Sequence, residues 1–410
     1  DIGSLDTSIL AGYPGTISSS WQQAGRAGRR DRPSITILVA SSSPVDQFLM
    51  GNPDYFFGAS PEHARLNPDN LHILVDHMKC ATFELPFRSN EAFGQENVCE
   101  IMTFLGEEGF VHAAGDSYQW ISEAYPANAV SLRRITSDNF LVIDSSKGDE
   151  VIAEVDFGSA LTTLHEKAIY MCQGVPYYVD RLDFEGRKAL VRPVQADYYT
   201  DAITYTDVKT LEIFEQQEQE PFRPFHGDIQ VTEEVVGFKK LKLFSLENVG
   251  SGELQLPEHE WHTTSFGISI AREILDAASY DSEQKIDGVR GLAYALRSVA
   301  LIYLMCDLRD LGVAVIDTLQ DKKIYQYQLR KRQISEDGRT SFQPNIYLYD
   351  KYPGGIGFSK TLYDQREMLL QAAKSLVENC KCESGCPSCI GAPLVYSRGA
   401  KEVVLWLVAK

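Results

Sequence analysis

Residues 18–32 read Ser-Ser-Ser-Trp-Gln-Gln-Ala-Gly-Arg-Ala-Gly-Arg-Arg-Asp-Arg, and they set the fold class that the sequence predicts. Arginine follows glycine twice in this stretch, at Gly25-Arg26 and Gly28-Arg29. Planar guanidinium groups bind phosphate oxygens in pairs, and neighbouring glycines let the backbone approach a phosphate closely. These residue types suit contact with phosphate, and the alternative is a basic helix start on a solvated face.

Residues 22–29, Gln-Gln-Ala-Gly-Arg-Ala-Gly-Arg, resemble the last signature motif of superfamily 2 helicases, which lies on the second of two RecA-like motor lobes. The resemblance implies that Arg26 and Arg29 are arginine fingers on a rigid helix. It also implies that Gln22 is their partner near the nucleotide and that Gly25 lies close to it. Gln23 departs from the arginine of many relatives.

The residues around this motif fit the same motor lobe. Asp1-Ile2-Gly3 resembles the end of the preceding helicase motif, which implies that Asp1 and Gly3 lie near the nucleotide. Residues 5–14 and 34–40 predict parallel strands, the second one buried. Neither a G-x-x-x-x-G-K-[ST] phosphate loop nor a D-E-x-H or D-E-A-D magnesium box occurs in the sequence. We therefore expect the C-terminal part of a longer helicase, in which ATP and Mg²⁺ bind with the missing first lobe, and no ATP hydrolysis by this chain alone.

Composition points to an ordinary globular protein. The chain has 410 residues, 44% hydrophobic and 23% charged, a length typical of about three domains. A net charge of −18 argues against a uniformly basic nucleic-acid surface but allows local basic patches. There is neither an apolar run of eighteen residues nor a signal-peptide pattern, so we expect a cytoplasmic protein with no membrane contact.

Residues 67–81 contain the pattern N-P-x-N-x-x-I-L-x-x-H-x-x-C-A, which resembles the segment after the second lobe in MrfA (YprA)-type DNA repair helicases. His72, His77 and Cys80 have metal-like spacing, but a helix face packed on the motor lobe is the preferred interpretation because no fourth ligand is near. An amphipathic helix at 97–107 and a hairpin at 109–121 predict a winged helix, with a packing module as the alternative. Arg133 and Arg134 are candidate phosphate contacts.

The middle of the chain predicts strand after strand. The runs at 140–143, 151–155, 168–171, 175–183 and 188–193 indicate a small β-barrel or a curled sheet. Residues 207–221 are polar and acidic, and we expect them to form a flexible connection. Residues 231–244 predict a further strand that carries Lys239, Lys240 and Lys242, which could touch phosphate or protect a strand edge.

Four cysteines crowd into ten residues near the C-terminus. Cys380, Cys382, Cys386 and Cys389 have the spacing C-x-C-x3-C-x2-C, directly after an amphipathic helix predicted at 367–378. Four thiolates in one loop form the closed shell of a structural zinc site, and an iron–sulfur cluster is the alternative. The remaining cysteines are scattered and predict core positions, as does a buried helix at 286–304.

Two other motifs near the C-terminus leave alternatives open. Asp307 and Asp310 would share one face of a helix, where pairing with a cation or a DNA-facing helix end is preferred to a magnesium nuclease site. The turn Tyr-Asp-Lys-Tyr-Pro-Gly-Gly-Ile-Gly at 349–357 could hold a DNA phosphate or only permit close packing. With the cysteines, this turn resembles the zinc-binding C-terminal domain of MrfA-type helicases.

We expect an α/β multidomain protein that combines the end of a RecA-like lobe, a winged-helix-like module, a small β-barrel and an α+β zinc-binding domain. The predicted domain ranges are 1–54, 55–134, 135–205 and 206–410. The resemblance implies an ATP-dependent 3′ to 5′ DNA helicase that acts in the repair of crosslinks or adducts. We expect it to be a monomer that binds single-stranded or 3′-tailed DNA, with a repair nuclease as a possible partner. The alternatives are a non-enzymatic, zinc-stapled nucleic-acid-binding scaffold, or a motor in phage defence or RNA remodelling.

Overall fold

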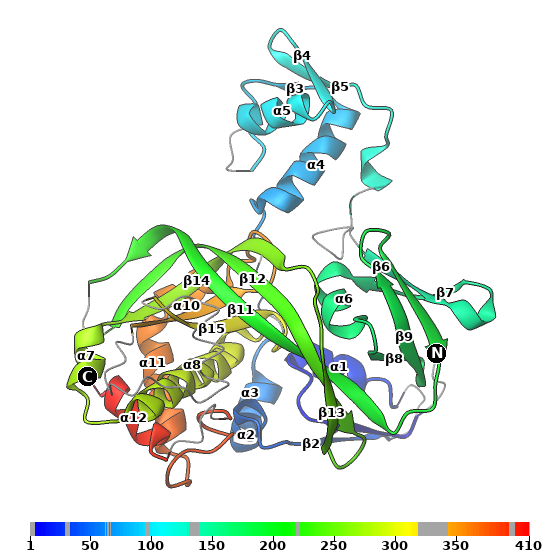
Figure 1. Cartoon of the computed structure of the whole chain (residues 1–410). Coiled ribbons are helices and arrows are strands. Elements are labelled where there is room, and N and C mark those ends of the chain that lie inside the picture. The colour runs from blue at the N-terminus through cyan, green and yellow to red at the C-terminus, as the bar shows by residue number, and fades with distance from the viewer. Residues whose placement is uncertain are drawn as a thin grey trace. The chain divides into compact units, whose positions relative to one another are not determined.

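The chain divides into two compact units, which are described separately (Figure 1). This computed structural model describes residues 5–28, 33–61, 63, 65, 67–94, 98–128, 130, 139–218, 222–318, 343–392 and 398–409. Unit 1 comprises Asp1–Asn67, Val208–Gln230 and His262–Lys410. Unit 2 comprises Pro68–Asp207 and Val231–Trp261. The predicted domain ranges remain a prediction.

Unit 1 begins with a small parallel sheet. Strands β1 (Thr7–Ala11) and β2 (Ile35–Val39) pair in parallel, as predicted. The accompanying helices are α1 (Ile17–Ala24), α2 (Pro44–Gly51) and α3 (Pro53–Gly58). The predicted burial of β2 is wrong, because Ile35 is 62% exposed and Val39 54% exposed. β-Branched residues that normally fill the interior of a parallel sheet are uncovered here.

A larger sheet supports the rest of unit 1. Its strand order is β11-β12-β14-β16-β15, and β13 pairs with β12. The strands are β11 (Tyr198–Gln216), β12 (Phe222–Lys242), β13 (Asn248–Glu253), β14 (His259–Ile270), β15 (Leu311–Asp317) and β16 (Pro344–Asp350). Strands β11, β12 and β14 have residues in both units, so the chain passes from one unit to the other within strands.

Helices cover this sheet and enclose the largest core (Figure 1). They are α7 (Arg272–Ala277), α8 (Ser282–Leu304), α10 (Phe358–Asp364), α11 (Arg366–Glu378) and α12 (Ala400–Val408). The predicted buried helix is α8, which starts with a capping box and ends where Met305 adopts a left-handed conformation. Apolar side chains of α8, α11 and α12 pack with those of β14, β15 and β16. No described helix, α8 included, is long and apolar enough to cross a membrane.

The first part of unit 2 has the order of a winged helix, as predicted. Its elements are α4 (Leu71–Glu84), β3 (Phe87–Arg88), α5 (Val98–Glu107), β4 (Val111–Ala114) and β5 (Ser117–Trp120). The strands form a sheet in the order β3-β5-β4. Asn70 caps α4, and Val98, Ile101, Met102 and Leu105 of α5 face the core, which matches the apolar period in the sequence.

The second part of unit 2 is a five-stranded sheet. Its strands are β6 (Asn139–Asp144), β7 (Glu150–Asp156), β8 (Ile169–Cys172), β9 (Val175–Asp183) and β10 (Lys188–Pro193), with helix α6 (Phe157–Thr163) packed on it. The strand order β7-β6-β10-β9-β8 leaves two different edge strands. The described strands therefore form an open sheet, not a closed barrel.

The predicted flexible connection at 207–221 is wrong for the residues that the structure describes. Residues 207–216 belong to β11, and β11 pairs with β12 along the edge of the larger sheet. Acidic and polar side chains suit an edge strand because they discourage pairing with other chains. The stretch lacks an apolar period because most of its side chains are exposed, while its order comes from backbone pairing with a distant strand.

Candidate metal centre and arginine motif

The four cysteines of the C-terminal loop converge on one point. Their sulfur atoms all lie within 4.8 Å of one another. The Cys380–Cys386, Cys382–Cys389 and Cys386–Cys389 sulfur distances are 3.6, 3.5 and 3.7 Å. The loop can close this tightly because Gly385 adopts a φ of 109°, and a β-carbon there would lie 2.2 Å from Ile390 Cδ1.

This geometry fits a single tetrahedral metal ion. With a Zn–S bond of about 2.3 Å, the edge of a ZnS4 tetrahedron is ~3.8 Å, close to the observed sulfur distances. A disulfide would bring two sulfurs to about 2.05 Å, and a cluster of several irons would spread the four thiolates farther apart. The donor set therefore fits zinc with no position left for a water or substrate, which is the chemistry of a structural site.

The thiols differ in how readily they ionise. Burial opposes ionisation of Cys386, but hydrogen bonds from the Cys380 thiol and the Ser388 backbone N–H lower its pKa to about 7. Burial raises the pKa of Cys382 and of Cys389. Three negative neighbours would oppose each thiolate in this loop, so a bound cation must supply the compensating charge.

The arginine motif lies at the end of α1. Thr16 caps the start of the helix by accepting a hydrogen bond from the Ser19 backbone N–H at 3.0 Å. Gly25 ends the helix, and the chain then turns so that Ala27 bridges to Leu5 beside β1. Gln22, Gly25 and Arg26 are all exposed at this end.

The structure corrects one detail of the predicted motif. Arg26 does not lie on the helix, because α1 ends at Ala24 and Arg26 is in the turn that follows. Glycine on either side of the Arg26-Ala27 pair explains the ending, since glycine disfavours a continuing helix. Arg29, Asp1 and Gly3 lie outside the described residues, and so do Arg133 and Arg134.

The loop between β1 and α1 is held from two sides. On one side, the buried Asp46 carboxylate accepts hydrogen bonds from the backbone N–H groups of Tyr13 and Ser41, at 3.1 and 2.6 Å. On the other side, the loop lies against Asp307. A β-carbon on Gly15 would lie 2.8 Å from an Asp307 carboxylate oxygen and 3.0 Å from the Asp307 α-carbon, so the backbones of Gly15 and Asp307 are in close contact. Sequence analysis did not single out Asp46, which lies in the first turn of α2.

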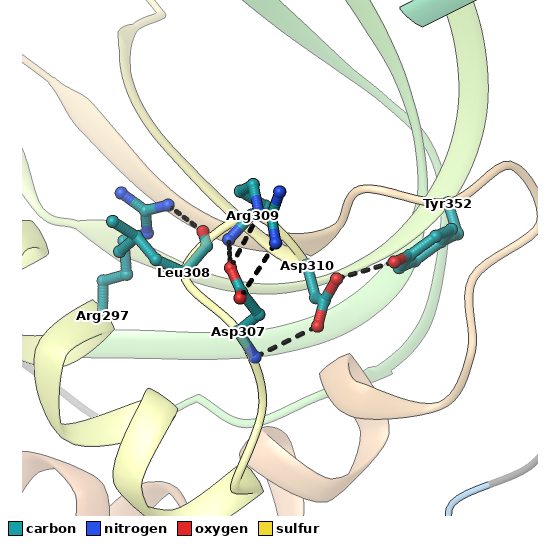
Figure 2. Close-up of polar contacts among 6 residues, drawn as sticks. All are labelled: Arg297, Asp307, Leu308, Arg309, Asp310 and Tyr352. Carbon is teal, nitrogen blue, oxygen red and sulfur yellow. Dashed lines mark hydrogen bonds and ion pairs between the residues drawn. The ribbon is translucent and has the colours of Figure 1, made fainter. Parts of the chain in front are cut away.

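Asp307 and Asp310 lie in a turn, not on a helix face (Figure 2). The Asp307 backbone N–H donates to Asp310 at 3.1 Å, and Tyr352 donates its hydroxyl to Asp310 at 2.6 Å. Arg309 pairs with Asp307 at 3.1 Å. The predicted pairing with a cation is confirmed for Asp307, whereas Asp310 accepts hydrogen bonds from a tyrosine hydroxyl and a backbone N–H.

The glycine turn at 349–357 is occupied by a side chain of the chain itself. The fully buried Asp350 carboxylate accepts hydrogen bonds from the backbone N–H groups of Ile356, Phe358 and Ser359, at 2.6, 3.1 and 3.1 Å. The amides that would bind a phosphate are therefore already used, which favours the packing interpretation of this turn. In the sequence, the position of Asp350 shortly before a glycine-rich helix start was the signal that could have indicated this packing role.

The possible metal ligands of α4 do not form a site. His72 and His77 are exposed and Cys80 is partly buried. The buried face of the helix is formed by Leu74 and Met78 together with a threonine. The histidines are not buried by the core of their own unit, and the expectation that they pack on the motor lobe stays a prediction. Among the described residues, only the four C-terminal cysteines could together hold a metal ion.

Two family profiles match parts of this architecture. The profile of the MrfA Zn-binding domain, MZB, matches residues 292–390, and that of the winged helix domain of ATP-dependent helicase HRQ1 matches residues 66–135. The ATP-dependent helicase YprA of Bacillus subtilis strain 168 is 41% identical over 410 residues, 100% of this chain and 52% of YprA. Over its whole length, the chain is similar to MrfA-type helicases. Its zinc-binding and winged-helix domains are those that the sequence predicted.

Solved structures and more distant relatives agree with the MrfA type. The crystal structure of DUF1998 helicase MrfA bound to DNA has a TM-score of 0.62 and 40% identity, and the match covers 100% of this chain and 52% of that one. ATP-dependent helicase HRQ1 of Saccharomyces cerevisiae is 27% identical over 427 residues, 99% of this chain and 38% of HRQ1. This chain thus spans about half the length of the MrfA-type proteins it matches.

Proposed function

We propose that this chain is the C-terminal portion of an ATP-dependent 3′ to 5′ DNA helicase or translocase that acts in the repair of crosslinked or otherwise damaged DNA. It contributes the arginine fingers Arg26 and Arg29 and the residues that bind DNA. A first motor lobe contributes the phosphate loop and binds ATP and Mg²⁺. By itself, the chain does not hydrolyse ATP.

The observation that carries the proposal is the exposed segment from Gln22 to Arg26 beside an uncovered parallel sheet. Gln22 and Arg26 are exposed, and the neighbouring strands leave Ile9, Ile35 and Ile37 at 67%, 62% and 47% exposure. Parallel sheets are normally covered on both faces, so this surface is suited to further strands and helices of a motor lobe. ATP bound between two lobes would then lie within reach of the guanidinium groups, which stabilise the charge of the transferred phosphoryl group.

The zinc ion in this proposal is structural. When bound, it holds Cys380, Cys382, Cys386 and Cys389 as a closed tetrahedral shell and ties the loop after α11 to the core of unit 1. The metal takes no part in the reaction. Its loss would loosen the domain whose core contains α8, α11 and α12.

DNA is the proposed partner. One solved MrfA structure contains DNA and another contains DNA and AMPPNP, which supports single-stranded or 3′-tailed DNA as the ligand of this chain. Winged helices commonly bind DNA, which supports a place for residues 66–135 beside the strand. We further propose that the protein is a cytoplasmic monomer and that a repair nuclease acts with it.

A combined metal and binding assay tests what this chain does alone. Plasma mass spectrometry is expected to find one zinc per chain, and an electrophoretic shift is expected with single-stranded DNA. Cys386→Ser and Cys389→Ser are expected to lose the zinc and weaken the shift. Cys172→Ser, which removes a partly buried thiol of unit 2, is the matched control and keeps both. Iron in place of zinc would point to a redox centre. An unchanged shift in the zinc-free variants would reduce the zinc-binding domain to a scaffold and place the DNA contacts elsewhere in the chain.

A further inference from the structure

Lys401 is a buried lysine at the start of α12 that reaches the cysteine loop. It is only 8% exposed. Its ammonium group donates hydrogen bonds to the backbone carbonyls of Cys380 and Cys382, at 2.7 and 2.8 Å. Its own backbone N–H donates to the Ser384 carbonyl at 3.3 Å. One residue thus contacts the loop at three points, two of which are metal-ligating positions.

The charge of Lys401 has no acidic partner. Within the described part of the chain, no carboxylate lies within ion-pair distance of its ammonium group. Lysine is almost never buried unless it is paired. Four thiolates around a divalent zinc carry a net charge of −2, and a buried ammonium beside them lowers the electrostatic cost of that charge. The cysteine loop is therefore the counter-charge of this lysine.

Helix α12 has a fixed position relative to the loop. Ala400, Val403, Val404 and Leu407 belong to the core of unit 1 together with α8. A β-carbon on Gly288 of α8 would lie 2.4 Å from a methyl carbon of Val403, so the two helices pack at close range. Lys401 projects from a rigid element, which is the arrangement that lets an outer residue orient metal ligands.

We propose that Lys401 is a positioning residue of the zinc site and that the zinc-binding unit extends through α12, beyond the matched range that ends at residue 390. Its ammonium group fixes the carbonyls of the first two ligand residues and balances the charge of the thiolates. The inference rests on the proposed zinc and goes beyond it by assigning a residue outside the four ligands. Lys401→Met should keep all four sulfurs and yet hold zinc more weakly.

Zinc release to a chromogenic chelator, 4-(2-pyridylazo)resorcinol, tests the proposal on the zinc-loaded chain. Removing an outer-shell partner usually costs about 10–100-fold in metal affinity, so Lys401→Met is expected to release zinc at least about tenfold faster. Lys401→Arg keeps the charge and is expected to restore most of the retention. Lys381→Met is the control, because Lys381 is an exposed lysine of the same loop, and its release rate should stay within about twofold of the wild type.

Circular dichroism separates this result from misfolding. If Lys401→Met does not fold, Lys401→Gln is measured, since glutamine keeps a donor to the carbonyls and removes the charge, and it too should release zinc faster. A folded, zinc-loaded Lys401→Met or Lys401→Gln that releases zinc at the wild-type rate overturns the proposal. A wild-type chain that binds no zinc overturns the zinc site itself, which is a different outcome.

Discussion

Asp350 provides a quantitative test of the packing in unit 1. Replacing it with alanine removes the acceptor of three backbone N–H groups at 2.6, 3.1 and 3.1 Å. Hydrogen bonds to a charged group contribute about 1.5–3 kcal/mol each, which amounts to ~5–9 kcal/mol for three. Burial, against the opposing effect of these donors, raises the pKa of Asp350 from 3.8 to about 6. The cost of burying the charged carboxylate therefore offsets part of the hydrogen-bond contribution, and the substitution removes that cost as well.

The expected net loss for Asp350→Ala is about 2–6 kcal/mol, a large part of the free energy of unfolding of a typical domain. Urea unfolding followed by circular dichroism measures it. Hydrogen exchange of the peptide 351–364 tests whether the loss of stability lies at this turn, because its amides should exchange faster in Asp350→Ala. Asp364→Ala is the control, because Asp364 ends helix α10 and forms an exposed pair with Lys360, so its replacement should change stability by less than about 0.5 kcal/mol. Equal unfolding midpoints and equal exchange for Asp350→Ala and wild type would refute this account of the turn.

Three further results are expected. Gly15→Ala should destabilise the chain by about 1–3 kcal/mol, because φ is 95° there and the new β-carbon would lie 2.8 Å from an Asp307 carboxylate oxygen. Thermal unfolding measures this loss, and Gly58→Ala is the control because the space around Gly58 is open. Burial lowers the pKa of His165, so it is neutral in the fold but gains a proton below about pH 6.5 when unfolded. The thermal unfolding midpoint should therefore be lower at pH 5.5 than at pH 7.5. The difference should be smaller in His165→Phe, whose ring can keep the stacking contact with Phe238. An equal difference in wild type and His165→Phe would contradict this role of His165. Stripping zinc with a chelator should remove binding free energy on the order of 10 kcal/mol and lower the midpoint until zinc is restored, and an unchanged midpoint would argue against a structural metal.

Local sequence signals predicted the elements that depend on local interactions. The apolar period of α5 gave its four core positions, and the predicted runs at 175–183 and 188–193 are the strands β9 and β10. The cysteine spacing predicted the metal centre because all four ligands lie in one loop, whose own turns bring them together. Signals of this kind need no knowledge of distant contacts.

Non-local contacts account for what the sequence did not reveal. Residues 207–216 form a strand only because β12 pairs with them, and their polar composition hides this. The apolar run of β2 predicted a buried strand, but burial depends on neighbours that the run does not specify. Lys401 has no motif around it, and its role appears only when α12 is packed beside the cysteine loop.

The arginine motif is proposed to serve an ATPase built from two motor lobes. The most direct test is DNA-stimulated ATP hydrolysis by a polypeptide that joins this chain to a first motor lobe with a phosphate loop. Arg26→Ala is expected to lower the rate by about 10³-fold or more with DNA binding unchanged. Arg272→Ala is the control, because Arg272 is exposed and paired with Asp276, and it should leave the rate unchanged. Undiminished ATP hydrolysis by the Arg26→Ala variant would contradict the proposed role of Arg26 as an arginine finger.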